Sequence, residues 1–258
     1  MDYTLLEQLS YKDLKEVAQT MDIPIRRGKV QMLQDIKIAL QEFESYKTEK
    51  LDKYERICPL GNPGTEGRTY LVKDSHGREY AMKTFRKQKS TDALQKQVQL
   101  QKIASDAGVA PNIIDVDTVS KYIVMEKMDR HLLEVIRANE MTLSERQQRQ
   151  IISIFKKLDN VGIFHGDANL DNYMYRGSKL YVIDFGHSRN ITSTLTKKLG
   201  TSTPNLDVLS LGIALKLREF GCSDSSYSYI TKYLSDEQKL QFGFNLKKRI
   251  KNSNRKKK

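Results

Sequence analysis

The sequence contains no tryptophan and has only two cysteines, four histidines and five prolines in 258 residues. Cys58 and Cys222 are too few for a disulfide framework, and they lack the close spacing of metal ligands. The four histidines are scattered along the chain, which argues against a zinc centre. The composition therefore excludes a small disulfide-rich secreted domain and gives no support for a zinc site.

Long apolar runs are also absent. No run approaches the roughly 18 residues that a membrane-spanning helix needs, so we expect no transmembrane segment. The first residues, MDYTLLEQLSYKDL, are acidic and polar where a secretory signal has a basic and then an apolar stretch. We therefore expect an intracellular protein, either cytoplasmic or nuclear. The 38% of apolar residues supports a globular core, and the length suits one two-lobed domain with a small appendage.

The net charge of +12 is concentrated at one end of the chain. Residues 247–258, KKRIKNSNRKKK, hold eight basic residues and no acidic one, so the rest of the chain carries only +4. Such a run is typical of a solvated, disordered tail. It also matches a nuclear localisation signal, or a segment that binds nucleic acid or an acidic membrane surface. The sequence leaves these interpretations open.

The hydrophobic pattern predicts helices first, then strands, then mainly helices. Residues 1–46 have apolar residues at helical spacing, with a capping box at Ser10 and Asp13 and a break around Pro24. Strands and one helix follow, and the predicted ranges are 54–60, 69–73, 79–85, 113–116 and 122–126 for strands and 91–107 for the helix. The remainder is mainly helical, with a hairpin at 173–175 and 180–183. This order predicts an α+β fold with two lobes.

Two features of the strand region suit phosphate binding. The loop Gly61-Asn62-Pro63-Gly64-Thr65-Glu66-Gly67 supplies glycines, which let backbone N–H groups approach phosphate oxygens closely. Lys83 follows on a strand and is a candidate cation for the same phosphates. Taken alone, such a loop is more often a plain turn, and such a lysine is more often a solvated strand residue.

The segment His165-Gly166-Asp167-Ala168-Asn169-Leu170-Asp171-Asn172 carries a more specific signal. It places the carboxylate of Asp167 and the amide of Asn172 five residues apart, in a polar loop after an apolar helical stretch. Asp167 can then face an acceptor hydroxyl while Asn172 turns toward a metal ion. Asp184 follows an apolar strand and begins Asp-Phe-Gly, and a carboxylate there is a natural Mg²⁺ ligand beside phosphates. The spacing predicts magnesium-dependent phosphoryl transfer.

Together these motifs resemble the signature of the protein-kinase superfamily in identity, order and spacing. Residues 207–215, DVLSLGIAL, resemble the helix that supports the catalytic loop, and residues 124–128, VMEKM, resemble the hinge that binds adenine. The resemblance covers about residues 54–220. It implies a two-lobed α+β kinase fold at 47–246, with an N-lobe at about 54–126 and a C-lobe at about 127–246.

The resemblance also implies roles for individual residues. Asp167 is implied as the catalytic base, Lys83 as the contact to the α- and β-phosphates of ATP, and His165 as a structural residue. Asn172 and Asp184 are implied as ligands of Mg²⁺. The implied nucleotide-binding residues are Leu60, Gly61, Gly64, Gly67, Lys83, Glu126 and Met128. ATP and Mg²⁺ are therefore the expected cofactors.

The sequence departs from the family pattern in four ways. No glutamate lies between Lys83 and the hinge, and Gln97 is the residue that best matches the position of the usual helix glutamate. Gly166 stands where regulated kinases have the arginine that binds a phosphorylated activation loop. Only twenty residues separate Gly186 from Asp207, and they contain no Ala-Pro-Glu sequence. About forty residues follow the 207–215 segment, so we expect a truncated C-lobe.

The H-G-D form of the catalytic loop is found mainly in atypical kinases and in small-molecule kinases. Compact chains of this kind also resemble the kinases of large DNA viruses, which leaves a viral origin open. Since Asn169 lies two residues after the base, where serine/threonine kinases usually have lysine, tyrosine specificity stays open as well.

Residues 1–46 resemble a SAP-type helix–extended–helix motif, a family that commonly binds DNA. Arg26, Arg27 and Lys29 would lie at the start of its second helix, where free N–H groups also favour phosphate. The alternative is a small helical pair that packs on the kinase lobe.

We expect a serine/threonine protein kinase that transfers the γ-phosphate of Mg-ATP to a protein hydroxyl. Nucleic acid is an expected second partner, through Arg26, Arg27, Lys29 and the 247–258 tail. One alternative is a small-molecule kinase of the same fold, because the peptide-docking platform is reduced. The other is a nucleic-acid-associated pseudokinase scaffold, which the missing helix glutamate favours.

Overall fold

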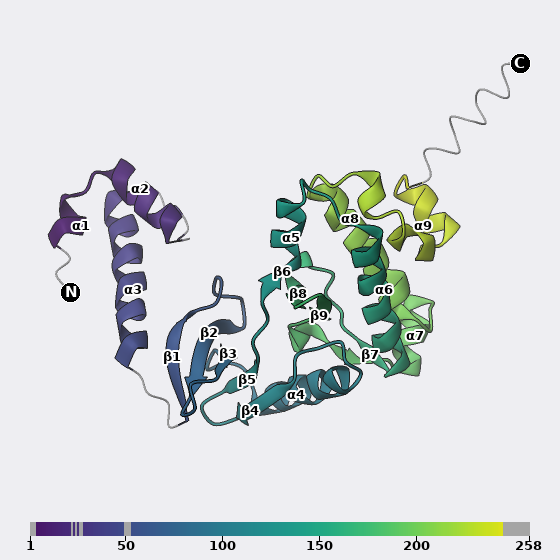
Figure 1. Ribbon diagram of the computed structural model, residues 1–258, viewed down its shortest axis with the longest axis horizontal. Coiled ribbons are helices and arrows are strands. Elements are labelled where there is room, and N and C mark those ends of the chain that lie inside the picture. Colours follow the sequence, from purple (N-terminus) through teal and green to yellow (C-terminus); the bar gives the residue numbers. More distant parts are fainter. Residues whose placement is uncertain (1–3, 22, 24, 26–27, 49–52, 245–258) are drawn as a thin grey trace, which may run out of the picture. The chain divides into compact units, whose positions relative to one another are not determined.

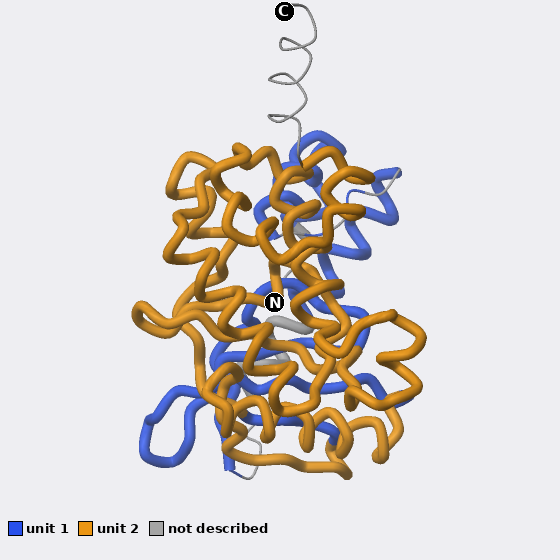
Figure 2. The backbone as a smooth tube through the Cα atoms, turned by 90° about the vertical axis from the view of Figure 1, so that its right-hand side faces the viewer, with its two compact units in different colours: residues 1–88, 121–124 blue, residues 89–120, 125–258 orange. Residues whose placement is uncertain are grey.

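The computed structural model describes residues 4–21, 23, 25, 28–48 and 53–244. The chain divides into two compact units, residues 1–88 with 121–124 and residues 89–120 with 125–258, drawn blue and orange in Figure 2. Arg26, Arg27 and the 247–258 tail lie outside the described residues. Among the described residues, no helix combines the length and the apolar composition that crossing a membrane requires.

The first unit begins with three helices, α1 (Thr4–Gln8), α2 (Tyr11–Thr20) and α3 (Lys29–Thr48) (Figure 1). The predicted capping box is confirmed, because the Asp13 N–H donates to Ser10 Oγ at 3.2 Å and the Ser10 N–H donates to Asp13 Oδ2 at 3.0 Å. The apolar positions of α2 and α3 meet in a small core of Leu14, Ala18, Met32 and Ile36.

The same unit contains the antiparallel strands β1 (Tyr54–Pro59), β2 (Gly67–Asp74) and β3 (Glu79–Phe85). The register of β2 and β3 places Gly67 opposite Phe85 and Thr69 opposite Lys83. The first residues of β5 (Tyr122–Glu126) lie beside β3, and the Phe85 N–H donates to the Lys121 carbonyl at 2.8 Å. Alternate residues form the core, which consists of Tyr54, Tyr70, Val72, Met82, Tyr122 and Val124.

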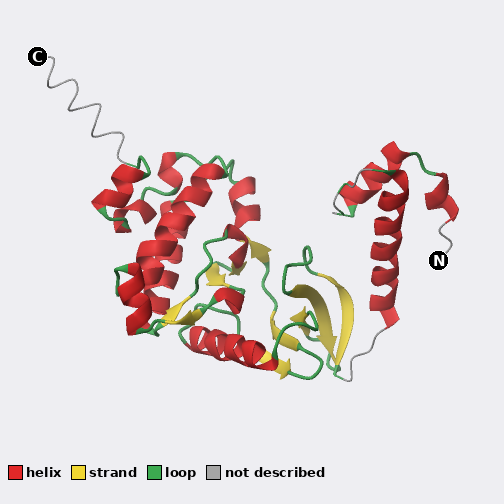
Figure 3. Ribbon diagram, turned by 180° about the vertical axis from the view of Figure 1, so that it is seen from behind, coloured by secondary structure: helices red, strands yellow, loops and turns green. Residues whose placement is uncertain are grey.

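The second unit is mainly helical (Figure 3). Its helices are α4 (Thr91–Asp106), α5 (Leu132–Ala138), α6 (Glu145–Asn160), α7 (Ser193–Leu199), α8 (Ser210–Glu219) and α9 (Asp236–Gln241). Its strands are β4 (Ile113–Asp117), β6 (Arg130–His131), β7 (Ile163–Phe164), β8 (Tyr173–Arg176), β9 (Lys179–Val182) and β10 (Arg189–Asn190). Strands β6, β8 and β9 form one small sheet, and β10 pairs with β7.

Helix α6 is central to the core of the second unit. It begins with a capping box between Ser144 and Gln147, and its apolar face is buried. The core that it shares with α8 and the β8–β9 hairpin includes Ile151, Phe155, Leu158, Tyr173, Val182, Ile213 and Leu217. Asp167 and Asn172 lie just before the hairpin and Asp184 just after it, so this core fixes the backbone on both sides of the hairpin. The predicted α+β fold and the predicted strands and hairpin are confirmed.

Candidate active site

The catalytic loop leads from β7 to β8 and ends in a short 3₁₀-helix, Leu170–Asn172. Asn172 Nδ2 donates to Asp167 Oδ2 at 2.8 Å, and the Asn169 N–H donates to Asp167 Oδ1 at 2.9 Å. Both oxygens of the carboxylate are therefore oriented by the loop itself. Because the amide nitrogen of Asn172 faces Asp167, its amide oxygen points away from that carboxylate and is available as a ligand.

His165 connects this loop to the strand end that precedes Asp184. Its Nδ1 lies 3.1 Å from the Asp167 carbonyl, and its Nε2 lies 3.0 Å from the Ile183 carbonyl. The ring is fully buried, and this burial lowers the pKa of His165, while the two carbonyls oppose the shift. The Ile183 N–H also donates to the Asn172 carbonyl at 2.8 Å. These contacts hold the two predicted metal-binding segments together.

Asp184 has an unusual backbone conformation. Its φ of 64° and ψ of 77° are rare for a residue with a side chain, and its Oδ1 accepts from the Gly186 N–H at 3.3 Å. Phe185 is buried edge-on against His165, with ring centroids 5.1 Å apart. Strained backbone of this kind persists where the surrounding structure holds it in place, and it is frequent at functional sites.

Gly166 also has a left-handed conformation, with φ at 80°. A Cβ atom at this position would lie 2.8 Å from the His187 carbonyl oxygen. The two segments approach so closely that no larger residue fits without displacing one of them. The backbone thus gives a physical reason for glycine where regulated kinases have arginine, a reason that the sequence alone could not supply.

A buried polar contact beneath the loop was not anticipated from the sequence. Asn205 Oδ1 accepts from the backbone N–H of His165 at 3.0 Å. Asn205 Nδ2 donates to Asp159 Oδ1 at 2.6 Å and to the Ile163 carbonyl at 2.7 Å. Burial raises the pKa of Asp159, although N–H groups of Asn205 and Leu206 donate to its carboxylate. The sequence offers one signal for this contact, since Asp159 and Asn205 are polar residues that lie beside apolar segments.

The predicted supporting helix is α8, which follows a π-helical turn at Asn205–Leu209. A Cβ atom on Gly212 would lie 2.5 Å from the Ala168 Cβ, so glycine allows α8 to approach the catalytic loop. Asp207 accepts hydrogen bonds from the Thr201 and Thr203 hydroxyls. The helix therefore contacts the loop through Gly212, while Asp207 fixes the segment that precedes it.

The hinge-like segment is partly fixed by its own side chains. The Glu126 carboxylate accepts from the Asn112 N–H at 3.1 Å and forms an ion pair with Arg176 at 2.6 Å. Although burial opposes the shift, these donors lower the pKa of Glu126. Met128 is buried in the same unit. With both side chains engaged in the fold, adenine recognition by this segment would rely on backbone groups, as the resemblance implies.

The glycine-rich loop lies between β1 and β2 of the first unit. The Leu60 N–H donates to the Thr69 carbonyl at 2.8 Å, and the Gly64 N–H donates to the Gly67 carbonyl at 2.9 Å. Gly61, Gly64 and Gly67 differ in how strongly the structure requires glycine at their positions. Gly61 has a φ of 70°, and a Cβ on Gly67 would lie 1.9 Å from the Thr84 carbonyl oxygen. Gly64 has no such constraint, since its nearest contact would be 3.7 Å.

Lys83 lies on β3 with its ammonium group turned toward this loop. Its Nζ is 3.4 Å from Glu66 Oε2 and 5.3 Å from the centre of the Phe85 ring. The Lys83 side chain is 13% exposed and that of Glu66 24% exposed, so the ion pair is partly shielded from solvent. The structure thus gives Lys83 an acidic partner in the glycine-rich loop.

Gln97, which its spacing matched to the usual helix glutamate, lies on α4 and is 3% exposed. Its Oε1 accepts from Lys89 Nζ at 3.1 Å. In the second unit, therefore, the buried amide has a lysine partner from the start of its own helix. The sequence suggested Gln97 because of its spacing, and it did not suggest Glu66, because a glutamate in a loop has no periodic signature.

The predicted site residues are divided between the two units. Asp167, Asn172, Asp184, Glu126 and Met128 belong to the second unit. The first unit holds Leu60, Gly61, Gly64, Gly67 and Lys83. Lys29, predicted to contact nucleic acid, begins α3, and its Nζ donates to the Glu7 carbonyl at 3.3 Å.

Comparison with known proteins gives a family for the larger part of the chain. A model of the protein kinase domain matches residues 54–206. The KEOPS complex subunit Bud32 of Pyrococcus abyssi is 35% identical over 86 residues, which are 32% of this chain and 39% of that protein. A probable bifunctional tRNA threonylcarbamoyladenosine biosynthesis protein of Methanobrevibacter smithii is 30% identical over 82 residues, 32% of this chain and 14% of that protein. Both matches thus span less than half of the relative's own length.

Proposed function

The chain belongs to the protein kinase family, and on that premise we propose that it transfers the γ-phosphoryl group of Mg-ATP to a serine or threonine hydroxyl of a protein. The observation that carries the proposal is the arrangement around Asp167. Its carboxylate is held by Asn172 and by the Asn169 N–H, in a loop fixed through His165 to the segment that ends at Asp184. A scaffold protein has no need for this arrangement, whereas in-line phosphoryl transfer depends on it.

Asp167 is the proposed base. One of its oxygens faces Asn172 and the other faces the loop backbone, so the carboxylate is oriented before any substrate binds. An acceptor hydroxyl that donates to Asp167 is aligned toward the γ-phosphorus atom and loses its proton to the carboxylate as the new P–O bond forms. The bond between the γ-phosphorus and the bridging oxygen breaks at the same time, and ADP leaves.

Asn172 and Asp184 are the proposed Mg²⁺ ligands. They offer an amide oxygen and a carboxylate, which are the oxygen donors that this hard cation prefers. Among the described residues no group of three or more His, Cys, Asp or Glu forms a complete metal cage. Two protein ligands suit Mg²⁺ because phosphate oxygens and water usually complete its shell. When bound, the ion neutralises charge on the phosphates.

Lys83 and the loop from Leu60 to Gly67 are proposed to bind the phosphates. The lysine is a compact cation, and a glycine-containing loop presents N–H groups at short range. The Glu126 to Met128 segment is proposed to bind adenine through backbone groups.

A second candidate function follows from the comparisons. The H-G-D form of the loop and the similarity to a KEOPS complex subunit and to a tRNA threonylcarbamoyladenosine biosynthesis protein favour an atypical kinase that acts within a complex. The outcome that would distinguish this candidate from the first is ATP hydrolysis without phosphoryl transfer to an added protein. The pairing of α2 with α3 fits the proposed SAP-like motif equally well in either function.

The test uses purified protein with Mg²⁺, γ-labelled ATP and a generic basic protein, beside Asp167→Ala and Asp184→Asn variants. If the wild-type protein transfers label to the basic protein and neither variant does, the result supports the proposed protein kinase activity. Release of labelled phosphate without transfer, again lost in both variants, supports the second candidate. If the protein binds ATP but neither transfers label nor releases labelled phosphate, both candidate functions are contradicted and a pseudokinase remains.

A further inference from the structure

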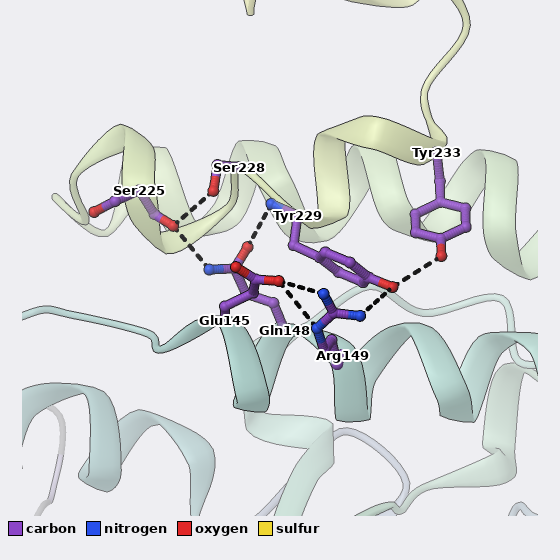
Figure 4. A network of polar contacts seen from close by, with 7 residues as sticks. All are labelled: Glu145, Gln148, Arg149, Ser225, Ser228, Tyr229 and Tyr233. Carbon is purple, nitrogen blue, oxygen red and sulfur yellow. Dashed lines mark hydrogen bonds and ion pairs between the residues drawn. The ribbon is translucent and has the colours of Figure 1, made fainter.

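A cluster of cations and tyrosines lies on the second unit, between α6 and the 3₁₀-helix η5 (Ile230–Tyr233). Figure 4 shows three of its residues, Arg149, Tyr229 and Tyr233. Arg149 Nη1 donates to the Tyr229 hydroxyl at 3.1 Å, and its guanidinium lies 4.2 Å from the centre of that ring. Lys156 Nζ donates to the Tyr233 hydroxyl at 3.2 Å. Lys232 Nζ lies 4.9 Å from the centre of the Tyr229 ring. We call these five residues the tyrosine–cation cluster.

The cluster is built on a buried support. Gln148 is fully buried, and its Nε2 donates to the Leu143 carbonyl at 3.0 Å and to the Ser225 carbonyl at 2.8 Å. Its Oε1 accepts from the Tyr229 N–H at 2.8 Å. The backbone that carries Tyr229 is therefore fixed to α6 by one amide that is satisfied on both sides, as Figure 4 shows. Both rings are half-buried, so the hydroxyl positions are set in advance.

The charges of the cluster are only partly balanced. Arg149 forms an ion pair with Glu145, whose Oε1 accepts from Arg149 Nε at 3.0 Å. For Lys156 and Lys232 no carboxylate lies within ion-pair distance in the part of the chain that the structure describes. The two lysines thus add positive charge that no carboxylate of the described residues pairs with, and an external anion would balance it.

The hydrogen-bond donors and acceptors of the cluster also favour binding of an anion. The two tyrosine hydroxyls are 3.2 Å apart, so one hydroxyl hydrogen lies between them. Both oxygens already accept from a cation, Arg149 for Tyr229 and Lys156 for Tyr233. The second hydroxyl hydrogen therefore needs another acceptor, because both hydroxyl oxygens already accept from a cation. The cluster thus presents hydrogen-bond donors and needs an acceptor, which here is solvent or a bound anion.

We propose that the tyrosine–cation cluster binds the phosphate backbone of a nucleic acid strand. Phosphodiester oxygens are acceptors with negative charge, and Arg, Lys and Tyr are among the side chains that contact them. Arg149 and Lys156 are seven residues apart on α6, which is about 10 Å along the helix axis. A single phosphate reaches one end of this surface, whereas successive phosphates of a polymer reach both. The surface is separate from the proposed catalytic residues and does not depend on phosphoryl transfer.

The test compares two double variants of the full chain. Lys156→Gln with Lys232→Gln removes two charges from the cluster, and Lys96→Gln with Lys102→Gln removes two exposed charges from α4. The probes are fluorescein-labelled 20-nucleotide single strands of RNA and DNA with the same sequence, followed by fluorescence anisotropy from 50 to 200 mM KCl. We expect the cluster variant to bind at least about fivefold more weakly and to lose about 1.4 units of salt slope, as for two phosphate contacts on a single strand. The α4 variant should keep the slope of the unchanged protein.

A third variant, Tyr229→Phe with Tyr233→Phe, retains the rings and removes the hydroxyls. We expect it to weaken binding about threefold with an unchanged salt slope, because neutral donors release no counterions. Equal losses in the cluster and α4 lysine variants would overturn the proposal, since they would show general attraction to a basic protein. It is also overturned if a phosphoserine peptide, but neither oligonucleotide, loses affinity in the cluster variant.

Discussion

The catalytic loop and the glycine-rich loop serve one proposed reaction but are built differently. In the catalytic loop, side chains take part in the contacts: Asp167 accepts from the Asn172 side chain and from the Asn169 backbone N–H, and both ring nitrogens of His165 face backbone carbonyls. In the glycine-rich loop, backbone hydrogen bonds close the turn, and Glu66 forms an ion pair with Lys83. The difference suits the proposed roles, since a catalytic base must be oriented in advance whereas phosphates are bound mainly by backbone N–H groups.

The largest expected effect breaks the catalytic loop at its centre. Asp167→Asn removes the base and places an amide against the Asn172 amide, so we expect kcat to fall by about 10²–10⁴-fold. ATP binding should change little, since Asp167 is proposed to contact the acceptor. Steady-state kinetics and calorimetric ATP titration measure the two effects. Asp171→Asn is the matched control, because it makes the same change at an exposed carboxylate of the same loop. Equal losses in both variants would remove Asp167 from the mechanism.

The second prediction tests how tightly the catalytic loop is packed. Gly166 and Gly177 both have positive φ, but a Cβ on Gly177 would meet nothing within 4 Å. Alanine at either position costs roughly 1–2 kcal/mol through backbone strain. At Gly166 the contact with the His187 carbonyl adds about 1–3 kcal/mol. We therefore expect Gly166→Ala to lower Tm more than Gly177→Ala and to lower kcat, which Gly177→Ala should leave unchanged. Similar Tm values for the two variants would contradict the packing argument.

The catalytic loop also shows how far the sequence alone could predict this region. The spacing of Asp167, Asn172 and Asp184 is a local property of the chain, and the strands before and after it have clear apolar patterns. The supports of the loop were not predictable in the same way. Asn205 reaches His165 across forty residues, and the reason for Gly166 is a carbonyl on another segment. Contacts of this kind depend on tertiary approach, which residue spacing does not report.

The third prediction concerns the cation of the glycine-rich loop. If Glu66 orients Lys83 for the phosphates, Glu66→Gln should lower kcat/KM by about tenfold, or about 1.4 kcal/mol of transition-state stabilisation. A neutral amide is a weaker partner because charge-assisted hydrogen bonds are roughly twice as strong. Glu79→Gln is the matched control, since Glu79 pairs with Lys73 on the same sheet at 3.8 Å. An unchanged kcat/KM for Glu66→Gln would show that the ion pair has no role in catalysis.

Gln97 provides a second test of which residue is the acidic partner of Lys83. Gln97→Glu restores the residue that the family usually has, and we expect it to raise turnover in the unchanged protein and in Glu66→Gln. A gain only in the Glu66→Gln background would show that one carboxylate is sufficient for Lys83. Unchanged or lower turnover in both backgrounds would show that Gln97 is not the matching position.

The smallest expected effect separates folding from ligand binding within the glycine-rich loop. Gly64→Ala introduces only an ordinary contact at 3.7 Å, so Tm should not fall. If the backbone at Gly64 approaches phosphate, the added methyl group should raise KM for ATP about threefold, a loss of roughly 0.7 kcal/mol. Gly67→Ala provides the contrast, because its Cβ would overlap the Thr84 carbonyl oxygen and lower Tm. A KM that stays constant in Gly64→Ala would mean that glycine at this position serves neither the fold nor the nucleotide.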